Sequence, residues 1–409
     1  MRKIIILLFF CFLNISIGYS RVFIQITGNP AEKISTEIII QGTDNYSKVF
    51  THILKQDLLY SDSFSVLKAQ TKADVNSESL FKKLAPDIKI LITGKILQKY
   101  ADIKIYKSTG QKYVYNLTFT PVVNNPVRMA HIVSDSIIYH LTGFPGIALT
   151  KILYISKNSG KKSINVCDYD GRNDRTIFAP DFLVNFPRWI SNNKIIYLSY
   201  RTGFPFLETM NLMTGTTKTV LAQPGINAEP SIFPNKKEMA VVLSRTGNSE
   251  IYIVGINGKI IRRITNFSSY VVASPTVSPN GKEIVFVLTK DGVTKLWEID
   301  PYGFGLHQLP ISGYYVTSPV WSPNGDYLAY VTGISDGMAI QIYDFKTGYI
   351  KTLTNSFSWS ESPSWAPDSR HIVFTRRNRN YQDSLWIVDI YTEDMRLLKN
   401  NADEPCWSK

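Results

Sequence analysis

Alternating apolar and polar positions dominate the chain after residue 150, in short segments that are separated by turns. Residues 283–288 and 295–299, for example, alternate with a period of two, which is typical of β-strands and not of helices. The turns between such segments carry Pro, Asn and Gly, as at residues 279–281, and these residues favour tight hairpins. The pattern therefore predicts many short antiparallel strands.

A proline that is followed two residues later by an aromatic or branched aliphatic residue recurs six times. These repeat prolines are Pro187, Pro230, Pro275, Pro319, Pro363 and Pro405. They are 43, 45, 44, 44 and 42 residues apart, and four short strands fall within each interval. Such a period is typical of one propeller blade. Six copies predict an all-β six-bladed β-propeller over residues 144–409.

The two ends of this repeat array complement each other. Residues 151–178 supply three strands of a blade that lacks its innermost strand, whereas residues 405–408 form an innermost strand with nothing after it. We expect the two segments to pair, because closure of the ring covers the end blades. Cys167 and Cys406 would then lie two strands apart, roughly 9–10 Å, which is too far for a disulfide. Two buried free thiols are expected.

Residues 21–143 mix helical and strand periods and predict a separate α/β domain in front of the propeller. Apolar residues from Tyr46 to Leu58 fall on one helical face, and a last helix begins at Pro126 behind Asn125 and ends at Gly143. A further short helix is expected at residues 77–85. Strands are expected at residues 22–26, 37–41, 64–67, 88–97 and 114–122.

The first twenty residues have the pattern of an export signal. Arg2 and Lys3 precede an apolar run at residues 4–13, and Gly18 and Ser20 are small enough to allow cleavage after Ser20. No later stretch reaches the roughly 20 apolar residues that a membrane-spanning helix needs. We therefore expect an exported protein that does not span the membrane.

Composition adds little to this interpretation. Hydrophobic residues make up 44% of the chain and charged residues 19%, which suits packed cores. The formal net charge of +12 favours acidic partners in general. Basic residues are scattered, and the cluster at residues 376–379 is typical of a solvated loop, so no nucleic acid is expected as a partner.

The sequence offers no assignable catalytic centre. The spacing of the five histidines predicts no zinc site, and no Gly-x-Ser-x-Gly nucleophile motif occurs. We therefore assign no catalytic residue, no metal ligand and no cofactor, although a cation in the propeller channel remains an open alternative.

Acidic and aromatic residues gather in the segments before the repeat prolines. The acidic ones are Glu229, Glu361, Asp403 and Glu404. Their loops share one rim of the ring, so the carboxylates could converge on the central channel. Three hypotheses stay open: a solvated rim, a rim that binds a partner or a cation, and a pair of catalytic carboxylates. The aromatic ones are Tyr270, Tyr314, Tyr315, Phe357 and Trp359, and exposed aromatics are typical of protein interfaces.

The order of export signal, small α/β domain and repeats of the form Pro-x-Trp-Ser-Pro-Asn-Gly resembles the TolB family of the Tol–Pal system. Residues 130–136, 141–143 and 167–171 also resemble that family's interdomain region and first blade. The resemblance implies a periplasmic protein that is not an enzyme and that supports outer-membrane integrity and cell division. In that family the propeller rim binds the lipoprotein Pal, and the N-terminal segment binds TolA of the inner membrane.

Transferred to this chain, the resemblance and the rim loops give two sets of expected partner-binding residues. On the propeller rim they are Ile226, Asn227, Ala228, Glu229, Tyr270, Val271, Val272, Ala273, Tyr315, Thr317, Trp359, Glu361, Asp403 and Glu404. In the N-terminal segment they are Arg21, Val22, Phe23 and Ile24. The expected partners are a Pal-like lipoprotein and a TolA-like inner-membrane protein. The rival hypothesis is a propeller enzyme, or a cation-dependent binding protein, that acts on an envelope peptide or sugar in the channel.

Overall fold

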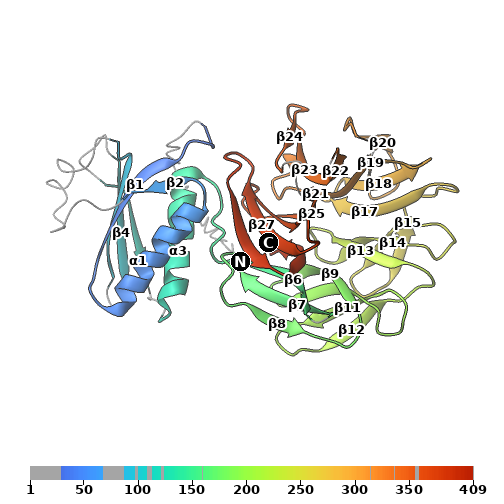
Figure 1. Ribbon diagram of the computed structural model, residues 1–409, viewed down its shortest axis with the longest axis horizontal. Coiled ribbons are helices and arrows are strands. Elements are labelled where there is room, and N and C mark those ends of the chain that lie inside the picture. The colour runs from blue at the N-terminus through green and yellow to red at the C-terminus, as the bar shows by residue number, and fades with distance from the viewer. Residues whose placement is uncertain are drawn as a thin grey trace, which may run out of the picture.

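The computed structural model describes residues 29–67, 87–96, 100–107, 113–120, 124–158, 160–313, 315–335, 337–354 and 359–408. They form an α/β domain followed by a six-bladed β-propeller (Figure 1). The expected leader, the strand at 22–26 and the helix at 77–85 lie outside the described residues. Among the described residues, no helix has the length and apolar character that crossing a membrane requires.

The α/β domain is built on one five-stranded sheet with the strand order β2-β1-β3-β4-β5. Its strands are β1 (Ile34–Gln41), β2 (Phe64–Val66), β3 (Ile90–Ile96), β4 (Ala101–Lys107) and β5 (Tyr113–Phe119). β1 runs parallel to β2 and β3, and the other pairs are antiparallel. Strand β4 is absent from the sequence-based expectation, although its buried Ala101, Ile103 and Ile105 alternate with more exposed residues.

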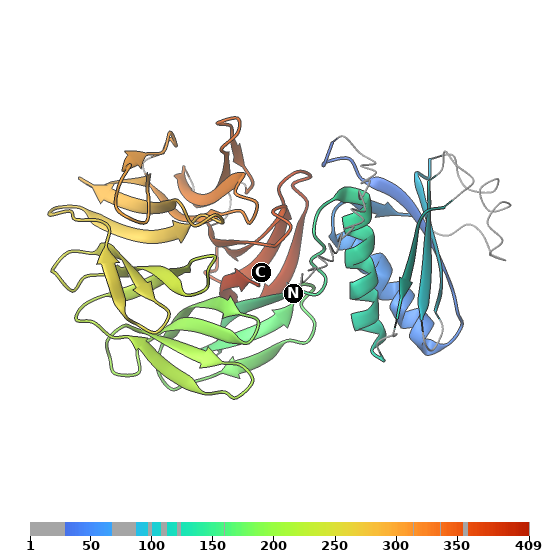
Figure 2. The same cartoon turned by 180° about the vertical axis from the view of Figure 1, so that it is seen from behind.

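Two helices cover one face of this sheet and lie between it and the propeller (Figure 1; Figure 2). α1 (Asn45–Tyr60) begins where the Asp44 side chain accepts the Ser47 N–H. α3 (Pro126–Thr142) begins behind Asn125, as predicted, and ends at Gly143, whose φ of 78° is left-handed. Buried apolar residues of both helices pack with the strands in one core.

The propeller consists of six four-stranded antiparallel sheets. Blade 1 contains β29 (Ala402–Trp407), β6 (Lys151–Asn158), β7 (Lys161–Asp168) and β8 (Arg175–Phe178). Blade 2 contains β9 (Val184–Ser191), β10 (Lys194–Ser199), β11 (Phe206–Asn211) and β12 (Thr217–Leu221). Blade 3 contains β13 (Asn227–Ile232), β14 (Glu238–Leu243), β15 (Glu250–Gly255) and β16 (Ile260–Arg263).

The remaining blades follow the same order. Blade 4 contains β17 (Val271–Val277), β18 (Ile284–Lys290), β19 (Val293–Ile299) and β20 (His307–Gln308). Blade 5 contains β21 (Val316–Trp321), β22 (Tyr327–Ile334), β23 (Gly337–Asp344) and β24 (Ile350–Thr352). Blade 6 contains β25 (Trp359–Trp365), β26 (His371–Arg377), β27 (Asp383–Asp389) and β28 (Met395–Asn400).

Strand β29 closes the ring by pairing with β6, so that Trp407 lies opposite Ile152. The Trp407 indole also donates a hydrogen bond to Thr150 Oγ1 at 2.7 Å, just before β6. Cys167 and Cys406 in this blade are free thiols. Cys167 is buried, and burial raises its pKa to about 12. Cys406 is only half-buried, contrary to expectation, because its side chain faces the central channel.

The propeller has two distinct faces. The innermost strand of blade 4 begins at Val271, opposite Thr289, and ends at Val277, opposite Ile284. We call the face where the innermost strands begin the pre-proline face, since it carries the loops before the repeat prolines. The opposite face carries the turns between the first and second strands, including residues 278–283. The α/β domain packs against this opposite face, on the turns of blades 1 and 6.

Candidate functional site

Each innermost strand of the propeller is distorted at the residue before its repeat proline. These residues are Phe186, Glu229, Ser274, Ser318, Ser362 and Glu404, and all six have a positive φ of 48–55°. The strand pairing shifts at the same place, for example between Ala273 and Thr276, which marks a β-bulge. A left-handed non-glycine residue costs about 1–2 kcal/mol. Six of them in one ring therefore mark a geometry that the whole fold imposes.

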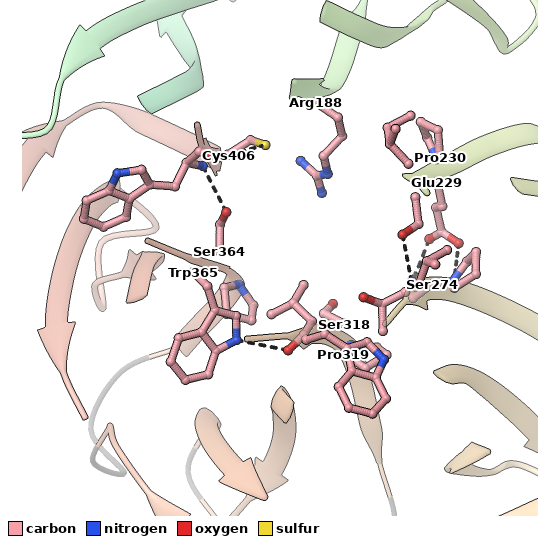
Figure 3. A pocket seen from close by; sticks show the side chains of 18 of the residues that line it. Arg188, Glu229, Pro230, Ser274, Ser318, Pro319, Ser364, Trp365 and Cys406 are labelled. Atoms are coloured by element: carbon pink, nitrogen blue, oxygen red, sulfur yellow. Dashed lines mark hydrogen bonds between the residues drawn. The ribbon is translucent and has the colours of Figure 1, made fainter. Parts of the chain in front are cut away.

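The residue after each repeat proline lines a central channel of about 240 Å³ (Figure 3). The six residues are Arg188, Ser231, Thr276, Val320, Ser364 and Cys406. Five of these side chains are small. Ser231 Oγ and Ser364 Oγ accept the backbone N–H groups of Val277 and Trp407 in the following blades, each at 3.0 Å. The channel wall thus links neighbouring blades.

The aromatic residue two positions after the repeat proline packs between blades, as its recurrence predicts. The indoles of Trp189 and Trp365 each donate to a backbone carbonyl of the preceding blade at 3.0 Å. Trp321 differs, because it stacks on Phe345 with ring centroids 4.5 Å apart. Its buried Nε1 has no hydrogen-bond partner in the described part of the chain.

The four acidic residues before the repeat prolines bind their neighbours instead of converging on the channel. Glu229 and Glu404 accept the backbone N–H groups of Ser274 and Phe186 in the next blades. Burial raises the pKa of both carboxyls. Of the four, only Glu229 lines the channel.

The other two acidic side chains also have partners. Glu361 lies 3.2 Å from the guanidinium of Arg377, and Asp403 accepts from Thr375 Oγ1 at 2.9 Å. Arg377 belongs to the basic cluster at residues 376–379 and also pairs with Asp383 at 2.7 Å. The contacts of Arg377 join adjacent strands of blade 6, and the contact of Asp403 joins blade 1 to blade 6.

The expected partner-binding residues of the rim separate into exposed and buried ones. Val271, Tyr315, Trp359 and Ile226 are 57%, 51%, 50% and 43% exposed. They lie on the pre-proline face of four consecutive blades. Tyr270 is half-buried against Phe267, with the Lys290 ammonium over its ring. Ala228, Ala273 and Thr317 are half-buried as well.

Three other expected rim residues are buried, namely Asn227, Val272 and Glu404. The Asn227 amide donates to the carbonyls of Pro205, Gln223 and Gly225 and so holds its loop together. Val272 belongs to the core between blades 3 and 4. Glu404 is also largely buried, at 6% exposure. The residues Arg21 to Ile24, Tyr314 and Phe357 lie outside the described residues.

On the opposite face, the α/β domain is joined to the propeller through Arg370, which is almost fully buried. Its guanidinium donates to the Asp389 carboxylate within the propeller. It also donates to Ser63 Oγ at 2.7 Å and to the carbonyl oxygen of Asp62 at 3.0 Å, both in the α/β domain. One buried cation therefore connects the two domains.

His371 extends this network. Its Nδ1 lies 2.6 Å from Asp368, and its Nε2 lies 3.3 Å from Asp62. Burial lowers the pKa of His371, but the carboxylates of Asp368, Asp62 and Asp389 outweigh burial and raise the pKa to about 9. Possible ligand atoms of Asp62, His371 and Asp389 lie within 4.8 Å of one another. Each of the three side chains already contacts an oppositely charged partner within the protein, so the cluster is an ion-pair network in this structure.

A second interdomain contact centres on Asp57 of α1. Its carboxylate accepts the Tyr169 hydroxyl of the propeller at 2.6 Å and the Ser134 hydroxyl of α3 at 2.7 Å. His131 Nδ1 lies 2.8 Å from the same carboxylate. The three side chains around Asp57 are thus fixed, and α1, α3 and blade 1 meet at one buried side chain.

Comparison with known proteins assigns the propeller. The family model described as the TolB beta propeller domain matches residues 138–409, which is more than half of the chain. The chain belongs to the TolB β-propeller family.

Relatives named Tol-Pal system protein TolB resemble this chain over part of their length. The TolB of Francisella tularensis subsp. tularensis is 26% identical over 283 residues, which are 65% of this chain and 65% of that protein. The TolB of Desulfosudis oleivorans is 38% identical over 126 residues, or 31% of this chain and 28% of that protein. The chain therefore spans slightly less than two thirds of the first relative's length.

A solved structure covers nearly the whole chain. The crystal structure of TolB from Acinetobacter baumannii has a TM-score of 0.82 at 24% identity, and the match covers 93% of this chain and 98% of that one. A putative TolB from Agrobacterium tumefaciens has a TM-score of 0.51 at 17% identity and covers 61% and 89%. At these identities the likeness shows the fold alone. It extends over both domains in the first structure.

Some residues of this TolB-type propeller stand out in the structure but not in the sequence-based expectation. Arg188 lines the channel, and Arg370 and Asp57 hold the domains together. A signal for Arg188 was present, because it follows a repeat proline at the position where the other five repeats have small residues. The junction had one local signal, Asp368, which lies three residues before His371.

Proposed function

We propose that this chain is a periplasmic scaffold of the Tol–Pal cell-envelope system, and that it is a binding protein rather than an enzyme. It holds a Pal-like lipoprotein on the pre-proline face of the propeller and a TolA-like inner-membrane protein through Arg21, Val22, Phe23 and Ile24. By linking the two it supports outer-membrane integrity and cell division. Family membership supports the system, and the leader at residues 1–20 supports the periplasmic location.

The observation that carries the docking surface is the set of exposed apolar side chains on the pre-proline face. Val271, Tyr315 and Trp359 are each at least half exposed. They belong to blades 4, 5 and 6, so together they cover an arc around the channel mouth. Exposed aromatic and branched side chains around a depression are typical anchors of protein interfaces. Their backbone is held by paired strands, which limits the entropy that binding must overcome.

The test is calorimetric titration of the mature chain, residues 21–409, with the soluble domain of the Pal-like lipoprotein of the same organism. We expect Val271→Asp and Trp359→Ala to weaken binding at least tenfold, since each removes or charges an exposed apolar contact of the surface. The matched controls are Tyr302→Ala and Phe304→Ala. Both residues are exposed, but they lie in the turn after β19 on the opposite face.

Equal affinities of the wild type and both pre-proline variants would contradict the assignment of the face. Loss of binding in the two control variants would place the partner on the opposite face instead. Deletion of residues 21–24 is expected to abolish binding of the TolA-like protein and to leave the lipoprotein affinity within about twofold.

A further inference from the structure

Arg188 is the exceptional residue of the channel. It comes from β9 of blade 2, directly after the repeat proline Pro187, and its guanidinium points into the channel (Figure 3). The equivalent residues in the other five blades are much shorter. The bulge before the proline occurs in all six blades, so the same backbone geometry presents a small side chain five times and a long cation once.

The guanidinium of Arg188 is poorly satisfied. An arginine has five N–H donors. The hydrogen bond given by Arg188 within the described part of the chain runs from Nη1 to the carbonyl oxygen of its neighbour Pro187, at 3.1 Å. None of the ion pairs found within 4.0 Å among the described residues involves Arg188. The buried Arg370 differs, because its guanidinium donates to a carboxylate, a hydroxyl and a carbonyl.

The nearby carboxylates do not neutralise this cation by direct contact. Glu229 and Glu404 face the backbone N–H groups of Ser274 and Phe186. Burial raises the pKa values of both carboxyls. The charge of Arg188 acts on them at longer range and lowers these pKa values by a smaller amount. The donors of Arg188 therefore stay available to a group that enters the channel.

The remaining wall suits a carboxylate on a short carbon chain. The hydroxyls of Ser318 and Ser362 line the channel and have no hydrogen-bond partner within the described ranges. The rings of Pro275, Pro319 and Pro363 supply apolar contact beside them. In a narrow channel with walls of low dielectric constant, a single charge attracts an opposite charge more strongly than it does in water. A guanidinium can bind both oxygens of one carboxylate.

We propose that the central channel is a carboxylate site, in which Arg188 binds an acidic side chain or a C-terminal carboxylate of the protein docked on the pre-proline face. This inference rests on the proposed function for the source of the carboxylate. It makes the channel part of the docking surface. The channel would attract an anionic group, whereas acidic rim residues would attract a cation.

The first arm of the test examines the channel without a partner. Sodium acetate replaces sodium chloride at constant ionic strength, and the arginine side-chain Nε–H signals of the mature chain are followed by nuclear magnetic resonance. The signal of Arg188 is identified by its loss in Arg188→Gln. We expect this signal to shift and saturate, while those of the exposed Arg245 and Arg379 do not. Absence of a shift, or a shift shared by all exposed arginines, overturns the carboxylate site.

The second arm uses the soluble domain of the Pal-like lipoprotein as the probe. We expect Arg188→Gln to weaken its binding roughly tenfold or more, and acetate to compete with it. Arg175→Gln, which removes the same charge from an exposed position at the opposite-face end of β8 in blade 1, should change the affinity less than twofold. Double-mutant cycles with Asp→Asn and Glu→Gln variants of the lipoprotein domain would then identify the carboxylate through its coupling with Arg188.

The arms separate the two hypotheses. Equal binding of the lipoprotein domain by the wild type and Arg188→Gln overturns the channel inference and leaves the scaffold function intact, and saturation with acetate would then reflect an adventitious ion only. If the wild type binds no lipoprotein domain, the proposed partner is wrong. In that case the acetate titration alone decides whether the channel is a carboxylate site.

Discussion

Two regions of this molecule enclose an arginine side chain, and they differ in how many of its N–H donors have a hydrogen-bond partner. At the domain junction, Arg370 is buried and donates to Asp389, to Ser63 and to the backbone of Asp62. In the channel, Arg188 is half-buried and donates to one neighbouring carbonyl. A buried charge needs hydrogen bonds or an ion pair from protein or water, because its desolvation otherwise costs several kcal/mol of stability. The junction is therefore a completed structural contact, whereas the channel has donors left for binding.

The largest effect is expected at the junction. Arg370→Ala would remove the guanidinium that contacts the buried Asp389 carboxylate, and breaking a buried pair on one side costs about 3–5 kcal/mol. We expect the free energy of unfolding, measured by urea denaturation, to fall by this amount. Arg379→Ala, at an exposed position, is the control and should change it by less than about 0.5 kcal/mol. A loss below about 1 kcal/mol in Arg370→Ala would show that the junction is not a structural contact.

The next effect is a dependence of stability on pH. The folded pKa of His371 is about 9, against 6.5 for an ordinary histidine, so the folded chain holds this proton more tightly than the unfolded chain. The contribution is complete below pH 6.5 and is lost as the pH rises through 9. It amounts to roughly 3 kcal/mol. Urea denaturation between pH 6 and 10 should therefore show a steeper decline in the wild type than in His371→Gln.

The control for this measurement is His307→Gln, since His307 is exposed on the propeller surface. It should keep the wild-type decline. The same slope in His371→Gln and the wild type would mean that other groups carry the pH dependence, and that His371 is not held as a cation by Asp62, Asp368 and Asp389.

A smaller effect is expected from the strained backbone of the pre-proline face. Ser318 has a φ of 51°. Glycine tolerates this conformation and a β-branched residue does not, so Ser318→Val should be less stable than Ser318→Gly by about 1–2 kcal/mol. Thermal unfolding of the two variants gives the comparison. Equal stability would indicate that the bulge can relax and that its shape is not fixed by the fold.

The smallest effect on stability is expected in the channel itself. Arg188→Gln removes one hydrogen bond to a neighbouring carbonyl, so the free energy of unfolding should change by less than about 0.5 kcal/mol. A loss as large as that of Arg370→Ala would make Arg188 a structural residue and would remove the contrast between the two regions.

The blades could be predicted from the sequence because their signal is local. Strand alternation and the repeat prolines each occupy a few consecutive residues and return from blade to blade, and Pro-Asn-Gly turns reinforce them at residues 279–281 and 323–325. The short β4 was missed even though its alternation is visible at Ala101, Ile103 and Ile105. A single strand without a repeat offers no second copy against which the pattern can be checked.

The junction could not be predicted in the same way, because its partners are remote in the chain. Tyr169 and Asp57 are 112 residues apart, and Arg370 and Ser63 are 307 apart. In the sequence, Arg370 looks like any polar residue of a hairpin turn. Its burial follows from the packing of the α/β domain on that turn, which no local pattern records.

For the rim, the location of the loops could be predicted from the sequence, but which of their side chains are exposed and which are buried could not. Asn227 and Val271 occupy similar loops before repeat prolines, yet Asn227 is buried and Val271 is 57% exposed. The amide of Asn227 is buried because it satisfies three loop carbonyls, whereas no core lies above Val271. Polarity alone would have suggested the reverse.

The most direct test of the scaffold account is amide hydrogen exchange of the mature chain with and without the soluble domain of the Pal-like lipoprotein. The account predicts slower exchange in the complex at residues 224–228 and 266–271 of the pre-proline face, and unchanged exchange in the turns at 278–281 and 322–325 of the opposite face. Protection confined to those turns, or protection nowhere in the propeller under saturating conditions, would contradict it.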